Sequence, residues 1–203
     1  MGMGTADEVI VDFTSSRDTP ASHARSTLIT TSIQAIRARG RFDAYDKSLP
    51  AELRETILTV VAGVWLEMDV AVAHYAACDA LGLSPQEQFA IGSEVGDRVQ
   101  GTMLGMIVRT AKDSELSPWT ALTQCARLYE RLFQGGSIKL TKLGPKDARM
   151  EVVNNRLFAF AYFRNGFRGL VCAGAELSCA KAYAHELPRL SSDTSLGLRI
   201  SWS

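Results

Sequence analysis

The stretch SPQEQFAIGSEVGDRVQGTMLGM, residues 84–106, decides how the chain folds. Ser84 stands before a proline, and Glu87 lies three residues after that serine, which together make a capping box with proline at the first helical position. The sequence therefore predicts a long helix from residue 85 to about residue 112. Glycines interrupt this helix at four places, and each one lowers helix stability relative to alanine, so a compensating contact is expected. The four are Gly92, Gly96, Gly101 and Gly105.

The spacing of these glycines indicates close packing. The members of each pair, Gly92 with Gly96 and Gly101 with Gly105, lie four residues apart and form a flat stripe along the helix. Such a stripe lets another helix, or a ligand, come close to the backbone. We expect helix packing, because the flanking apolar residues supply a core face. The spacing does not match a dinucleotide-binding G-x-G-x-x-G, and no predicted strand precedes it.

Three further helices are predicted before this stretch. Apolar spacing favours helices at about residues 22–39, from Pro50 onward, and at about residues 69–81. Gly40, Gly63 and Gly82 stand where these helices are expected to end or break. Residues 1–21 have little apolar content and are expected to form a flexible N-terminal arm.

After the stretch, the pattern changes from helix to strand. Ser117-Pro118 predicts a helix that ends near Gly135-Gly136. Two strands joined at Gly144-Pro145, a helix at 163–182 and a final hairpin follow. The predicted fold class is α+β, with an N-terminal helical layer packed on a C-terminal antiparallel sheet in ββαββ order. We expect a single domain over 22–203, with a helical part at 22–135 and a sheet-containing part at 136–203.

Composition excludes several classes of protein. Hydrophobic residues make up 46% and charged residues 22% of the 203-residue chain, which excludes wholesale disorder. Lys+Arg and Asp+Glu are each 22, so a generic nucleic-acid-binding protein is not expected. The charges are unevenly spread, because residues 1–101 carry 8 basic and 14 acidic side chains and the rest carry 14 and 8. The basic segment 127–168 is therefore a binding face for an anion, an acidic partner or a membrane surface, or else the two halves attract each other or a partner subunit covers the segment.

The chain shows no signal for export or membrane insertion. The first residues lack the apolar run of a secretory signal, and the longest apolar stretch, residues 57–66, is far short of the ~20 residues that span a bilayer. We expect a cytoplasmic protein without integral membrane insertion. Its cysteines, at 78, 125, 172 and 179, form no C-x-x-C pair and are expected to be reduced.

Recognisable catalytic motifs are missing from the sequence. There is no G-x-S-x-G, no phosphate-binding P-loop and no H-E-x-x-H, so we do not expect an enzyme. His74 and Cys78 lie four residues apart on one predicted helix, a spacing that can hold a metal, but two ligands do not make a site and none is expected. If the fold holds a pocket, the candidate polar wall groups are His74, Tyr75, Cys78 and Tyr129.

Five segments occur in an order shared with a known group of α+β proteins. They are IGSEVGDRVQGTMLGM at 91–106, LYERLFQGG at 128–136, LGPKDAR at 143–149, FRGL at 167–170 and RISW at 199–202. On these segments the chain resembles haem–nitric-oxide-binding domains, 4-vinyl-reductase domains and the Bet3-like subunits of the TRAPP vesicle-tethering complex. It is similar to an uncharacterised paralogous family of myxobacteria that looks like a member of this group.

The resemblance implies a fold and a range of functions. It implies helices on an antiparallel sheet, a dimer through the helices in many members, and in some an apolar cavity between the layers. The Tyr-x-Ser-x-Arg clamp of haem-binding members is absent from the sequence, so no cofactor is expected, with haem as the alternative. The first hypothesis is a non-catalytic interaction or sensor module in signalling or assembly, acting as a homodimer or with another protein. The second is a small-molecule binder for haem, a tetrapyrrole or a lipid.

Overall fold

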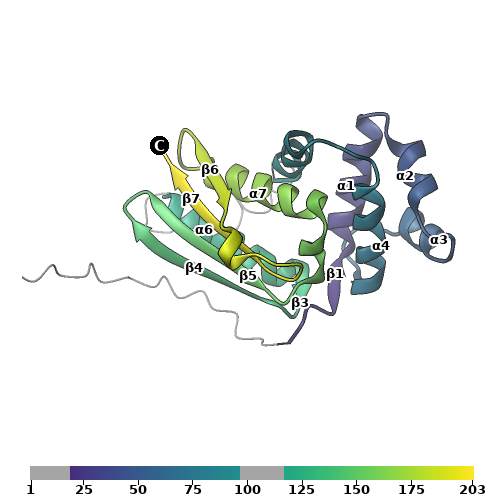
Figure 1. Cartoon of the computed structure of the whole chain (residues 1–203), viewed down its shortest axis with the longest axis horizontal. Coiled ribbons are helices and arrows are strands. Elements are labelled where there is room, and N and C mark those ends of the chain that lie inside the picture. Colours follow the sequence, from purple (N-terminus) through teal and green to yellow (C-terminus); the bar gives the residue numbers. More distant parts are fainter. Residues whose placement is uncertain (1–18, 97–116) are drawn as a thin grey trace, which may run out of the picture.

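The structure is a computed structural model that describes residues 19–96 and 117–203. The predicted N-terminal arm lies almost wholly outside the described residues, as do Gly101, Gly105 and the last part of the predicted long helix. Figure 1 shows the arrangement of the labelled elements.

The first described part is mostly helical. Its elements are β1 (His23–Arg25), α1 (Ser26–Ala38), α2 (Phe42–Ser48), α3 (Ala51–Thr59), β2 (Trp65–Glu67) and α4 (Met68–Asp79). The three predicted helices correspond to α1, α3 and α4, while α2 and the two short strands were not predicted. Gly40 and Gly82 follow α1 and α4 with φ of 66° and 63°, a conformation that glycine adopts without strain.

Both predicted Ser-Pro helix starts are confirmed. Residues 85–96 are helical, and the backbone N–H of Ser84 donates to Glu87 Oε2 at 2.8 Å while the N–H of Glu87 donates to Ser84 Oγ at 3.3 Å. The helix α6 (Pro118–Leu132) begins at Ser117, whose side chain accepts from the N–H of Thr120. Local capping chemistry therefore sets both starts.

The predicted ββαββ unit is also confirmed. It consists of β4 (Ser137–Gly144), β5 (Asp147–Val153), α7 (Ala161–Ala175), β6 (Ala182–Glu186) and β7 (Leu196–Trp202), with short 3-10 helices at Arg156–Ala159 and Pro188–Leu190. The strands form an antiparallel sheet in the order β4-β5-β7-β6. A second, small sheet in the order β2-β1-β3 adds β3 (Phe133–Gln134) and ties the start of the helical part to the end of α6.

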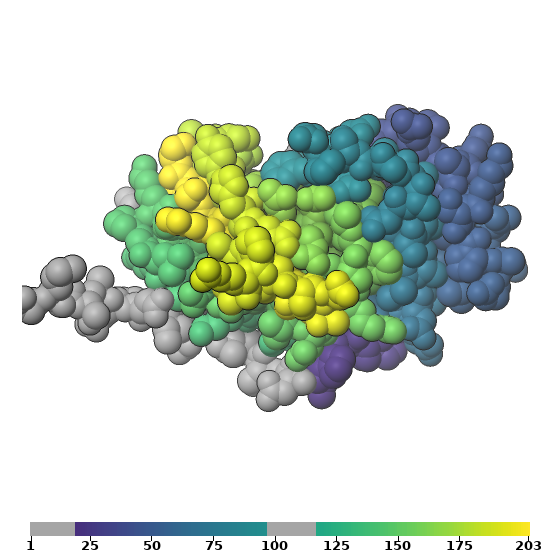
Figure 2. Space-filling view, viewed as in Figure 1, coloured from purple at the N-terminus to yellow at the C-terminus, as the bar shows by residue number. Residues whose placement is uncertain are grey.

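The helices that cover the four-stranded sheet are α6 and α7. Figure 1 shows them between the sheet and the remaining helices, with α2 and α3 at the far end of the molecule. Alternating strand residues such as Leu140, Met150 and Ile200 are buried, as a half-covered sheet requires. In the space-filling view of Figure 2 the helical and sheet-containing parts meet without a gap on this face. The core is thus continuous through α4 and α7.

Candidate functional site

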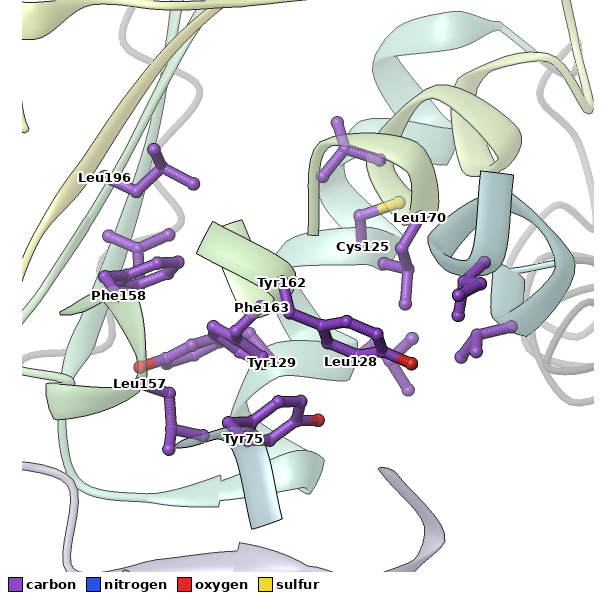
Figure 3. Close-up of a cluster of buried hydrophobic side chains, with 14 of the residues drawn as sticks. Tyr75, Cys125, Leu128, Tyr129, Leu157, Phe158, Tyr162, Phe163, Leu170 and Leu196 are labelled. Atoms are coloured by element: carbon purple, nitrogen blue, oxygen red, sulfur yellow. The ribbon is translucent and has the colours of Figure 1, made fainter. Parts of the chain in front are cut away.

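An apolar cavity, here called the central cavity, lies where five helices meet. It has a volume of about 50 Å³ and is lined by α1, α4, helix 85–96, α6 and α7, with one residue from β3. Lys, Arg, Asp, Glu and His are all absent from its lining among the described residues. Figure 3 shows a cluster of buried side chains that includes several residues of the cavity wall, among them Tyr75, Tyr129 and Tyr162. Six aromatic side chains line the cavity: Tyr75, Tyr129, Phe133, Tyr162, Phe163 and Phe167.

The aromatic rings of the wall pack against one another. The ring centroids of Tyr75 and Phe163 are 4.8 Å apart at an interplanar angle of 67°, and those of Tyr129 and Phe133 are 4.7 Å apart. Phe163 and Phe167 continue the contact at 6.2 Å. These distances are typical of stabilising aromatic pairs. The rings themselves therefore take up most of the space between the helices, which explains why the free volume is small.

One wall of the central cavity is a contact between glycines, here called the glycine seam: Gly92 and Gly96 of helix 85–96 against Gly166 and Gly169 of α7. A Cβ atom placed on Gly92 would overlap the Gly166 carbonyl group, and one on Gly169 would overlap the Phe89 carbonyl oxygen. A Cβ atom on Gly96 would lie 2.8 Å from the Ala173 Cβ. The two helices therefore touch through their backbones, which the glycine stripe in the sequence allows.

The three tyrosines of the wall differ in their hydrogen bonds. Tyr129 Oη accepts from Asn155 Nδ2 at 3.1 Å, and Tyr162 Oη lies 2.8 Å from Ser32 Oγ. Tyr75 Oη has no hydrogen-bond partner within 19–96 and 117–203. Burial raises the pKa of Tyr129 to about 12 and the pKa of Tyr75 well above its ordinary value. All of them are therefore neutral phenols, able to donate one hydrogen bond each.

His74 and Cys78 are buried behind the cavity wall. Tyr45 Oη lies 2.6 Å from His74 Nδ1, and Cys78 Sγ lies 3.5 Å from His74 Nε2. Cys78 Sγ is also 3.9 Å from Ser32 Oγ, which links these groups to Tyr162. This series of five contacting side chains, here called the polar chain, runs from α2 through α4 and α1 to α7.

The cysteine–histidine contact in the polar chain does not form a nucleophile and base for catalysis. Both side chains are fully buried. Burial lowers the pKa of His74 to about 3, and burial raises the pKa of the Cys78 thiol. A thiolate–imidazolium pair is therefore strongly disfavoured. Within the described residues no group of three or more His, Cys, Asp or Glu side chains is placed to hold a metal ion.

The structure separates the four predicted pocket residues into two sets. Tyr75 and Tyr129 line the central cavity, while His74 and Cys78 belong to the polar chain and lie outside its wall. Sequence reasoning missed Ser32, Tyr162 and the phenylalanines of α7. The concentration of aromatic residues between 158 and 167 is a signal that could have found the residues of α7, but not Ser32.

Part of the basic segment 127–168 is engaged with the protein itself. Three of its arginines form ion pairs: Arg149 with Glu151, Arg156 with Asp69, and Arg164 with Glu186. The Arg156–Asp69 pair joins the basic half of the chain to the acidic half. Its side chains are 53% and 74% exposed, so it contributes little to stability.

None of the helices in the described part of the chain is long and apolar enough to cross a lipid bilayer.

The order of elements and the central position of the cavity define the class of fold. The structure matches H-NOX proteins, which confirms the predicted resemblance to haem–nitric-oxide-binding domains. The unliganded Fe(II) H-NOX protein from K. algicida matches with a TM-score of 0.62 and 9% identity, over 88% of this chain and 96% of that one. An oxygen-binding H-NOX domain related to soluble guanylate cyclases matches with a TM-score of 0.55 and 14% identity, over 88% and 94%. A variant of the T. tengcongensis H-NOX gives 0.52 and 15%, over 88% and 97%. At these identities the likeness shows the fold alone.

A family model identifies the chain more closely. It matches residues 54–203 and is described as "Protein of unknown function (DUF2378)". The chain belongs to this family. No curated protein matches it.

Haem is the first cofactor to consider for the central cavity, because one of the similar structures concerns haem redox potential. The cavity volume of about 50 Å³ is far below the roughly 300–1,000 Å³ of ordinary ligand pockets. The only buried histidine among the described residues, His74, is held by Tyr45 and lies outside the wall. Arg and Lys, which would pair with haem propionates, are absent from the described lining. The sequence between residues 97 and 116 contains no His, Cys or Tyr either. These residues do not fit a haem.

Proposed function

We propose that this chain is a non-catalytic sensor module of the H-NOX fold that takes a small apolar molecule in place of haem. The observation that carries the proposal is the central cavity, which is apolar, carries no charge among its described lining residues, and lies between the helical part and the α6–α7 layer. Cavities lined by apolar side chains are sites for small apolar guests. A free volume of about 50 Å³ favours a guest of only a few non-hydrogen atoms.

The position of the cavity supports a sensor rather than a store. Its wall is built from α1, α4 and helix 85–96 of the helical part together with α6 and α7. A guest therefore contacts both parts of the molecule at once, and it stabilises whichever arrangement of the two parts binds it better. The buried, uncharged state of His74 and Cys78 favours the non-catalytic function. The output is then a change in contact with a protein partner, either a second copy of this chain or another protein of the cytoplasm.

The proposal is tested with isobutene as the probe. We expect a saturable change in the amide chemical shifts of cavity residues in the ¹⁵N-labelled chain as dissolved isobutene increases. Leu28 lines the cavity and is only half-buried, so Leu28→Trp should plug the cavity without loss of the fold. In the control, Val61→Trp, the same side chain is added at a position that is 68% exposed.

The outcomes separate the alternatives. Binding that Leu28→Trp abolishes and Val61→Trp leaves intact supports the proposed site. No saturable binding to the unmodified chain, or equal binding to both variants, overturns it. A sharp Soret band that titrates stoichiometrically with added haem would show haem binding and contradict the proposal that a small apolar molecule takes its place. Light scattering tests the predicted homodimer, and a strict monomer without a co-purifying partner speaks against the interaction part of the proposal.

A further inference from the structure

We propose that the Tyr75 hydroxyl is the polar anchor of the central cavity, so that the preferred guest is a small uncharged molecule with an apolar body and one hydrogen-bond acceptor, such as a ketone. This inference rests on the proposed function, since it names the chemical class of the guest and the residue that selects it. Among the three tyrosine hydroxyls of the wall, that of Tyr75 has no hydrogen-bond partner in the described structure, while the other two are paired.

The Tyr75 side chain is buried, yet its hydroxyl meets no protein partner. The residue is 4% exposed, and its hydroxyl has no hydrogen bond to any residue that the structure describes. A donor that lines an apolar cavity without a partner is uncommon in proteins and needs a reason. Tyr129 and Tyr162, from the same wall, are both paired, to Asn155 and Ser32. An acceptor atom on a guest would supply the missing partner.

A second hydroxyl pair lies close to the proposed anchor. The Tyr75 and Tyr162 ring centroids are 6.1 Å apart, and Figure 3 shows their hydroxyl oxygens pointing to the same side of the cluster. Tyr162 Oη and Ser32 Oγ share a single hydrogen bond, although each hydroxyl carries a hydrogen. The second hydrogen of this pair has only a weak acceptor in the described structure, Cys78 Sγ at 3.9 Å from Ser32 Oγ. The polar side of the cavity is thus rich in donors and suits an oxygen that accepts.

The surroundings exclude a charged guest. No described lining residue carries a formal charge, and an isolated carboxylate or ammonium in such a site is strongly disfavoured. Since burial raises the pKa of Tyr75 well above its ordinary value, the phenol stays protonated and remains a donor. The donor, the apolar walls and the volume of about 50 Å³ together fit an acetone-sized carbonyl compound.

Acetone and isobutene form a matched pair of probes, because they have the same shape and differ by an oxygen in place of a CH₂ group. Their affinities are measured by amide chemical-shift titration of the unmodified chain and of Tyr75→Phe, which removes only the hydroxyl. Tyr183→Phe, at a tyrosine that is 48% exposed, is the control. Loss of one neutral hydrogen bond is worth about 1 kcal/mol, so Tyr75→Phe should weaken acetone about fivefold. Isobutene binding should be unchanged or tighter.

The outcomes distinguish this inference from the proposed function. If neither probe binds the unmodified chain saturably, the proposed function fails and the anchor fails with it. If both probes bind but Tyr75→Phe changes the two affinities alike, or leaves acetone unaffected, the cavity stands and the anchor is overturned. Selective weakening of acetone by Tyr75→Phe, with none in Tyr183→Phe, supports it. An unchanged melting temperature of Tyr75→Phe shows that the variant is folded.

Discussion

His74 and Tyr75 are neighbours in α4 and their rings are in contact, with centroids 4.7 Å apart, yet their polar atoms meet different surroundings. His74 lies in the polar chain, where Tyr45 and Cys78 contact both of its ring nitrogens. Tyr75 faces the central cavity, where its hydroxyl has no partner among the described residues. Two adjacent residues of α4 thus differ, because the ring nitrogens of His74 meet partners within the protein while the hydroxyl of Tyr75 meets none in the described structure. The comparison teaches that two adjacent buried polar residues can differ in whether the protein itself meets their hydrogen bonds.

The largest expected effect comes from removing the centre of the polar chain. His74→Ala leaves a void and takes the partner from Tyr45, so we expect the free energy of unfolding to fall by about 3 kcal/mol. Urea denaturation measures it. His185→Ala, at an exposed position, should change stability by less than about 0.5 kcal/mol. A loss below about 1 kcal/mol in His74→Ala would show that the polar chain does not hold the helices together.

Replacement of tyrosine by phenylalanine should give different results at Tyr45 in α2 and at Tyr75 in α4. Tyr45→Phe leaves His74 Nδ1 buried without its partner at 2.6 Å, and we expect stability to fall by about 2 kcal/mol. Tyr75→Phe removes a hydroxyl that has no partner in the described structure, so stability without a guest should change by less than about 0.5 kcal/mol. Thermal and urea unfolding of both variants test this. Equal losses of stability in the two variants would contradict the contrast between the paired hydroxyl of Tyr45 and the unpaired hydroxyl of Tyr75.

The polar chain also predicts how stability depends on pH. In the unfolded chain the imidazole binds a proton below its ordinary pKa of about 6.5, whereas buried His74 stays neutral until its pKa of about 3. Between these values the unfolded state binds more protons, so stability falls as the pH falls. From about pH 8 to about pH 5.5 the contribution of His74 is a loss of about 1.4 kcal/mol. His74→Gln should lack this part of the pH dependence, and His185→Gln should keep it. Parallel pH profiles for the unmodified chain and His74→Gln would refute the assignment.

The smallest expected effect concerns another hydroxyl without a hydrogen-bond partner in the described structure, that of Thr141, which lies away from the cavity. Thr141 in β4 is 2% exposed, and its Oγ1 has no hydrogen-bond partner in the described structure. Thr141→Val keeps the shape and removes that hydroxyl, so we expect unchanged or slightly higher stability, by up to about 1 kcal/mol. Acetone affinity should be unaffected, since Thr141 does not line the central cavity. Weakened acetone binding in this variant would mean that removing a distant unpaired hydroxyl also lowers acetone affinity, so the effect of Tyr75→Phe would not be specific to the cavity.

Much of the fold follows from local sequence. The starts of helix 85–96 and α6 are set by Ser84 and Ser117, each of which caps its helix within three residues. The β4–β5 turn and the final hairpin were likewise predictable from turn residues and alternation. The missed elements depend on distant contacts. The seven-residue α2 is held where Tyr45 meets His74, and the three-residue strands β1 and β2 pair only with each other and with β3.

The candidate site was less accessible from sequence for a geometric reason. Helical spacing correctly places His74 and Cys78 on one face of α4, and their side chains do contact each other. It does not say which face of α4 meets the cavity. That depends on how α7 crosses α4 and brings Tyr162 and Phe163 against Tyr75. Because the crossing is a long-range contact, the sequence pattern could not show that Tyr75 lines the cavity while His74, whose ring touches that of Tyr75, does not.

The glycine seam restricts which residue can stand at position 92. Gly92 lines the central cavity, and the Gly166 carbonyl group lies where a Cβ atom of residue 92 would be. A single methyl group at position 92 would therefore act as a wedge, pushing α7 away from helix 85–96 and widening the space between them. A methyl group at Gly166 would instead meet its neighbours at ordinary van der Waals distances, the nearest at 3.8 Å, and would leave the two helices in place. The absence of a side chain at position 92 is therefore what permits the close contact that forms this part of the cavity wall.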